Sequence, residues 1–235
     1  MKTNKLLVAS AAATMMMTGL TTNAYAVGAT GTSKATVHFD LPKDAVPVKD
    51  PTAPEKDMER STDGGTVDNA TSAGLSLDYV TNLNFGENKS IEGKDQTFET
   101  TTTEPFIQVS DRRGTGDGWN VTAKVDHFKQ GETETLDGAK IVLTQGVAKD
   151  AVGHPVEPDV NPDIELMAGG DAAPVVIAKA KTDDKLASAA GLGTWIISWL
   201  KSNNAASKAE LVVPANAASE GTHNADITWT LTSGV

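Results

Sequence analysis

Hydrophobic and polar residues alternate along this chain in short segments, a pattern typical of β-strands. In residues 35–41, ATVHFDL, the apolar Val37, Phe39 and Leu41 alternate with polar residues, as in a half-buried strand. From about Ser76, further segments of alternating or β-rich composition recur between Gly, Pro, Asn and Asp: LSLDYVTNLNFG, PFIQVSD, GWNVTAKVDHF, AKIVLTQGV, IELMA, APVVIAKAK, GTWIISWL, AELVVP and HNADITWTLTSGV. Short strands between regular turn signals predict an all-β fold, a sandwich-like domain of short antiparallel strands with long loops.

Residues 42–66 have a different composition. They hold four of the ten prolines, many charged residues and almost no large apolar ones. Such a segment buries too little apolar surface to offset the entropy of ordering it, which predicts a linker or long loop. We therefore expect an N-terminal strand and Pro- and charge-rich linker over residues 27–70 and a β domain over residues 71–235.

The N-terminus has the features of a secretory signal peptide over residues 1–26. Lys2 and Lys5 precede an apolar run from Leu6 to Leu20, and the small-x-small sequence Ala-Tyr-Ala ends at Ala26. The run is too short for a comfortable membrane span, so we expect cleavage and export, with no membrane span in the mature chain.

Charge and cysteine content narrow the function classes. Removal of residues 1–26 takes away two lysines and leaves 18 basic against 31 acidic side chains, a net charge of −13. This field opposes binding to nucleic acid or to an anionic lipid surface. The chain has no cysteine, so its stability cannot depend on disulfides or thiolate metal sites.

The sequence contains no recognisable catalytic or cofactor motif. The four histidines are scattered without metal-ligand spacing, and no nucleophile elbow, phosphate-binding loop or dinucleotide fingerprint is present. Asp111 and Asp117 lie among glycines, but their spacing differs from that of a calcium-binding EF-hand, and the glycines are explained by turns. We expect no enzyme activity, no cofactor and no metal site.

Two tryptophans head similar short patterns. Trp119 and Val121 lie two residues apart, as do Trp229 and Leu231, so on a strand each pair shares one face. Asn120 and Thr230 then point to the opposite face. From the pattern alone, the two pairs are interpreted as ordinary sandwich core, because their apolar faces continue along both segments.

The same residues carry a resemblance to a known family. SDRRGTGDGWNVTAKV, followed far downstream by a terminal ITWTLTSGV, resembles the WxL domain family of Gram-positive cell-surface proteins, which has two separated W-x-L motifs. LDYVTNLNFG, PFIQVSD, LDGAKIVL, GTW and LVVPANAASEGTHNADITWTL occur in the family's order, so the resemblance covers roughly residues 76–235. It departs at Val121, where leucine is usual, and at His223, where tyrosine is frequent.

The resemblance implies an exported β domain held noncovalently on the cell wall, with peptidoglycan as ligand and other surface proteins as companions. It implies a ligand site, or the scaffold of one, at two W-x-[LV] motifs: Trp119, Asn120, Val121, Trp229, Thr230 and Leu231. Aromatic and aliphatic side chains would contact sugar C–H faces, and neighbouring polar groups would bond hydroxyls or stem peptides.

Two alternatives remain open. In the first, the chain is an interaction subunit whose main partner is another surface protein. In the second, it is a wall hydrolase, although no catalytic nucleophile, metal set or paired acid can be identified for this reading. Val235 ends the sequence without an LPxTG-type sorting signal, so we expect free secretion or noncovalent retention.

Overall fold

The computed structural model describes residues 30–58 and 74–234, and it confirms the all-β prediction. The chain divides into two units, residues 1–39 and 40–235. The expected signal peptide lies outside the described residues. In the described part, no helix has the length and apolar character needed to cross a membrane. The described residues of the second unit contain one short 3-10 helix, η1 (Leu186–Ser188), and fourteen strands: β1 (Leu75–Val80), β2 (Gln96–Glu99), β3 (Phe106–Asp111), β4 (Trp119–Val125), β5 (Lys129–Gln130), β6 (Thr133–Glu134), β7 (Lys140–Thr144), β8 (Val147–Asp150), β9 (Asp159–Val160), β10 (Asp163–Met167), β11 (Ala173–Ala178), β12 (Gly193–Ser198), β13 (Lys208–Val213) and β14 (Ile227–Ser233).

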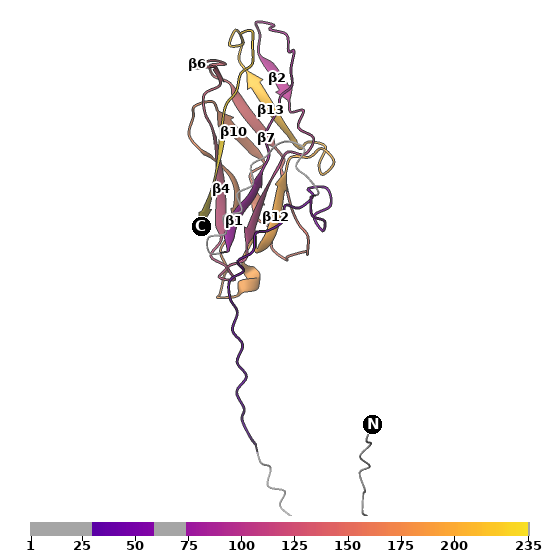
Figure 1. Cartoon of the computed structure of the whole chain (residues 1–235), viewed down its shortest axis with the longest axis vertical. Coiled ribbons are helices and arrows are strands. Elements are labelled where there is room, and N and C mark those ends of the chain that lie inside the picture. The colour runs from indigo at the N-terminus through magenta and orange to yellow at the C-terminus, as the bar shows by residue number, and fades with distance from the viewer. Residues whose placement is uncertain (1–29, 59–73, 235) are drawn as a thin grey trace, which may run out of the picture. The chain divides into compact units, whose positions relative to one another are not determined.

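The described strands of the second unit form three four-stranded sheets and a two-stranded hairpin. Figure 1 shows these strands as arrows. The strand orders of the sheets are β1-β3-β12-β8, β10-β7-β13-β2 and β14-β4-β11-β9, and β5 pairs with β6 in the small hairpin. Every ladder in these sheets is antiparallel. Most paired strands are distant in sequence, so the fold depends on long-range pairing rather than on a succession of hairpins.

One hydrophobic core joins the three sheets. Alternate residues of β4, β7, β10 and β13 are buried, as the period of two predicts. The core includes Trp119, Trp195 and Trp199 together with Ile, Leu and Val side chains from all three sheets. Since the chain has no cysteine, this shared core is the main source of its stability.

Each of the nine segments predicted from Ser76 onward contains a strand. GTWIISWL, whose pattern is compatible with strand or helix, forms β12. The pattern missed β2, in which Phe98 is the only large apolar residue, and β8, of which only Val147 falls within a predicted segment. It also missed the two-residue strands, which are too short to show a period.

The first predicted strand is not formed. Residues 35–41 have no ladder, and Val37 and Phe39 are 72% and 84% exposed. Their alternation is that of a strand, but a strand requires a neighbour to satisfy its backbone groups. Among the described residues, no strand ladder or β-bridge includes this segment.

The described part of the predicted linker packs on the β domain. We call residues 44–58 the strap. Val46 and Pro51 are buried, and Val48 and Met58 pack against a small cluster of Tyr79, Phe106 and Ile196. The strap turns back on itself, with a hydrogen bond from the backbone N–H of Met58 to the carbonyl of Val48. A few apolar side chains spread through a proline-rich sequence therefore suffice to hold it.

A buried polar network joins the strap to the sheet. The amide nitrogen of Gln108 donates to the carbonyl of Pro47 and to a carboxylate oxygen of Asp78, each at 3.0 Å, and its oxygen accepts the backbone N–H of Lys49 at 2.6 Å. The hydroxyls of Ser76 and Ser110 also donate to Asp78, at 2.5 and 2.6 Å. Burial raises the pKa of the Asp78 carboxyl, and these hydrogen bonds offset only part of that effect.

The raised pKa of Asp78 predicts a pH dependence of stability. Its contribution is fully present below the ordinary value of 3.8 and is lost as pH rises through the raised native pKa. We expect the free energy of unfolding of the parent, relative to Asp78→Asn, to fall as pH rises above about 4. Denaturant unfolding at several pH values measures this difference.

The matched control is Asp171→Asn, because Asp171 is exposed on a loop. The free energy of unfolding of the parent, relative to Asp171→Asn, is expected to show no comparable decrease as pH rises. A parent that gains stability over Asp78→Asn as pH rises would contradict the raised pKa.

Candidate functional site

The two tryptophan motifs lie on neighbouring strands of one sheet. β14 pairs along its whole length with β4, and the register places Leu231 opposite Val121 and Trp229 opposite Ala123. The residues predicted as a site, although far apart in sequence, are therefore brought together. Because side chains alternate along each strand, the motifs present one inner and one outer set of residues.

Trp119 and Val121 belong to the inner set and are fully buried. The indole N–H of Trp119 donates to the carbonyl of Gly191 at 3.0 Å, so its one polar group is satisfied inside the core. Gly191 has a φ of +67°, and a Cβ there would lie 2.7 Å from the Trp119 ring. This ring fills the protein interior, and a ligand cannot reach it without opening the sandwich.

Trp229 and Leu231 are also on the inner side but are only half-buried, because β14 is at the edge of its sheet. The Trp229 ring packs against Trp199, with 6.2 Å between ring centroids. Since Trp119 lies opposite Ser233, the two motif tryptophans are four positions apart along the ladder, roughly 13 Å. They do not form one aromatic platform.

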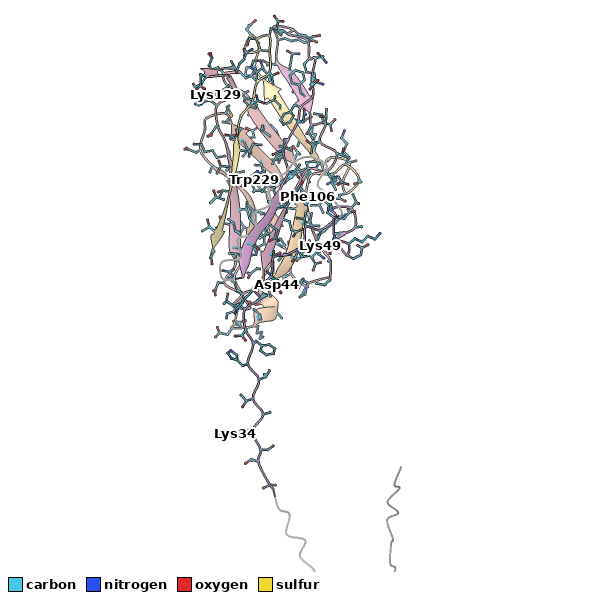
Figure 2. The ribbon with its side chains drawn as sticks, viewed as in Figure 1. Lys34, Asp44, Lys49, Phe106, Lys129 and Trp229 are labelled. Atoms are coloured by element: carbon cyan, nitrogen blue, oxygen red, sulfur yellow. The ribbon has the colours of Figure 1, made fainter. Side chains whose placement is uncertain are left out.

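A small hollow lies beside Trp229. Trp229 and Phe106, two of its lining residues, are labelled in Figure 2. The lining of the hollow is mainly apolar and comes from several elements: Thr81, Leu83, Pro105, Phe106, Leu143, Trp199 and Trp229. The hollow gives the Trp229 ring limited access to solvent. Of the four apolar residues of the predicted site, only Trp229 and Leu231 are thus even partly accessible.

The middle residues of the motifs point outward. Asn120 is partly exposed and Thr230 is exposed, and the pairs Asn120–Thr232 and Thr122–Thr230 lie side by side. We call this surface the outer face, made of six side chains: Asn120, Thr122 and Lys124 on β4, and Thr228, Thr230 and Thr232 on β14. Beside it on β11 lie Pro174, next to Thr122, and Ile177, next to Asn120.

Arg113 connects the two motif strands at one end. Its guanidinium forms a salt bridge with Asp111 at 2.8 Å and donates to the carbonyl of Gly118, immediately before Trp119, at 2.9 Å. It also donates to the hydroxyl of Ser233 at the end of β14. The hydrogen bond with Asp111 raises the pKa of Arg113 further, so its charge is permanent.

Sequence reasoning missed this role of Arg113. The only signal was its place in the DRRG stretch, directly before a glycine-rich turn. That turn requires Gly114, Gly116 and Gly118, which all have positive φ, as the sequence predicts. The turn folds the chain back so that the Arg113 side chain reaches both strands.

His223, which departs from the family pattern, anchors the loop before β14. One ring nitrogen lies 2.9 Å from the hydroxyl of Thr135, and the other lies 2.9 Å from the carbonyl of Ser219. His223 thus helps to fix the entry of the chain into the second motif and stands outside the outer face.

The outer face is polar and nearly uncharged. Among residues 30–58 and 74–234, no group of three or more His, Asp and Glu side chains is placed to hold a metal ion. The outer face offers hydroxyl and amide groups with a single charge, that of Lys124, so it suits neutral polar ligands.

The sequence matches one protein family over nearly its whole length. The model of this family, described as WxL domain surface cell wall-binding, matches residues 26–234. No curated protein and no solved structure matches the chain. The match confirms the resemblance that the motifs carry and extends it over the strap and residues 35–41.

Trp119 is fully buried and Trp229 only partly, so replacing them is expected to lower the free energy of unfolding by different amounts. Trp119→Phe is expected to lower the free energy of unfolding by about 2 kcal/mol or more, because it leaves a cavity and an unpaired Gly191 carbonyl. Trp229→Phe is expected to cost about 1 kcal/mol or less, because the ring is half-exposed. Urea denaturation of both variants measures the difference, and equal losses would contradict it.

Proposed function

The chain belongs to the WxL family of surface cell-wall-binding domains, and from this premise we propose that the outer face of β4 and β14 holds it noncovalently on peptidoglycan. The observation that supports this most strongly is the β4–β14 register, which places Asn120 and Thr230 on one accessible surface. The proposal divides the predicted site: its middle residues contact the ligand, and its apolar residues support them.

The charge distribution supports this choice of surface. The mature chain is strongly acidic, yet the outer face contains no acidic residue. A cell wall carries negative charge, so a locally neutral face lowers the repulsion that the rest of the surface creates. Threonine hydroxyls and the Asn120 amide supply both donors and acceptors for sugar hydroxyls, N-acetyl groups and stem-peptide amides.

The inner residues determine the position of the outer ones. Trp119 and Val121 fix β4 against the core, and Leu231 holds β14 in register beside it. If either strand slipped by one residue, its side chains would change faces, and Asn120 on β4 or Thr230 on β14 would point inward. The tryptophans and aliphatic residues of the motifs therefore act through the geometry of the face.

The Gram-positive cell surface as location, and export by a cleaved signal peptide, are parts of the same proposal. The alternative function, an interaction subunit of a surface complex, is supported by the half-exposed Trp229 beside its apolar hollow. A protein partner could cover that hollow, whereas a hydrated glycan would gain less from it.

Cosedimentation with purified sacculi stripped of teichoic acid tests the proposal. The double variant Asn120→Ala/Thr230→Ala is expected to lose at least about tenfold in affinity while its thermal midpoint stays near that of the parent. The matched control is Thr97→Ala/Thr133→Ala, which removes two exposed hydroxyls from other strands.

The control is expected to sediment like the parent. Equal sedimentation of both double variants and the parent would contradict the outer face as the site. If even the parent fails to bind clean sacculi and is retained only after a wall-anchored companion is added, the interaction subunit is the correct function.

A further inference from the structure

β14 is an edge strand without the usual protection against further pairing. Natural edge strands are kept from pairing by charges, prolines, bulges or shortness. β14 is seven residues long, ITWTLTS, and has none of these features. Its β4 side is fully paired, and within the described residues no ladder forms on its other side.

The other sheet edges are protected. β9 has two residues, β2 has four and includes Glu99, and β8 carries Lys149 and Asp150. β10 exposes Asp163 and Glu165, and β1 has a bulge between Leu77 and Tyr79. β14 is therefore distinguished from these edges by its length and by its lack of charge.

Several apolar side chains of β1 and β14 are only partly buried. β1 lies near β14 without pairing to it. Leu75 and Leu77 of β1 and Ile227 and Trp229 of β14 are all only half-buried against the core. A strand added to β14 would place its inward side chains over these residues.

Residues 35–41 have the composition of such a strand. Val37 and Phe39 expose 72% and 84% of their surface, and with Leu41 they repeat at the spacing of Ile227, Trp229 and Leu231. The alternate residues Thr36, His38 and Asp40 would face outward beside the threonines of β14, where they meet no like charge.

We propose that residues 35–41 of one molecule add as a strand to the free edge of β14 in a second copy of the chain. Backbone hydrogen bonds along the edge and burial of Val37 and Phe39 stabilise the contact. A second copy fits this role because each chain carries both the donor segment and the acceptor edge. If two molecules each add residues 35–41 to the β14 edge of the other, they form a two-fold dimer. If each molecule adds this segment to the next one, they form an open row.

Association of the mature chain, residues 27–235, tests the proposal by sedimentation velocity over a range of concentrations. The parent is expected to form dimers or larger species at about 100 μM. Val37→Thr/Phe39→Thr is expected to lower the association constant at least about tenfold, with no change in thermal midpoint.

The control Thr36→Ser/His38→Gln alters the polar side of the same segment and is expected to associate like the parent. A parent that stays monomeric, or equal association of both variants, would overturn the proposal.

Disulfide trapping identifies the edge, because the chain has no cysteine of its own. His38→Cys protein is mixed with protein carrying a single cysteine at Thr228, Thr230 or Thr232, and cross-links are mapped by mass spectrometry. At least one β14 position is expected to form a cross-linked heterodimer, whereas Glu165→Cys on β10 is expected to form none. Equal trapping at Glu165 would overturn the proposal. So would a disulfide closed within one monomer of His38→Cys/Thr230→Cys, since the segment would then cover its own edge.

Discussion

The antiparallel ladder between β4 and β14 is the constraint on which the rest of the site depends. It aligns two motifs from distant parts of the chain, and its register decides which of their side chains face the core. The buried ring of Trp119, bonded to the Gly191 carbonyl, anchors the ladder from within, and Arg113 joins the two strands at one end. With a side-chain period of two, the same tripeptide serves both the core and the surface.

This division explains why the tryptophans alone would be a poor guide to the accessible surface of the two motifs. A large aromatic at the start of a central strand contributes most when it is sealed from water, as Trp119 is. Trp229 is on the edge strand and keeps partial exposure beside Trp199. The tripeptide pattern thus marks the fold, and the accessible chemistry lies in the residues between and beside the aromatics.

Much of the fold followed from the sequence because strands such as β4, β10 and β14 alternate clearly between apolar and polar residues. Several others, such as β11 and β12, are short apolar segments between turn residues. The pattern did not predict β2, because Phe98 is its only large apolar residue. Residues 35–41 have the alternation of a strand, but no strand ladder includes them among the described residues. The packing of the strap was not predicted, because its prolines and charged residues are typical of a linker. Its hydrogen bonds involve the buried Gln108 on a distant strand, and a local sequence pattern does not show such a contact. The family resemblance identified the motif residues. Which of them face the core and which face outward could be read only from the β4–β14 register. The role of Arg113 could not be predicted, because its side chain contacts both strands only in the folded chain.

The central claim is that the outer face meets the wall while the inner residues support it. Amide and indole NMR shifts of the labelled mature chain, titrated with soluble peptidoglycan fragments, test this most directly. The account predicts the largest shifts at the amides of Asn120, Thr122 and Thr230, with the indole N–H of Trp119 nearly unmoved because it stays bonded to Gly191. Dominant shifts on the sheet formed by β10, β7, β13 and β2, with the β4 and β14 amides unchanged, would contradict it.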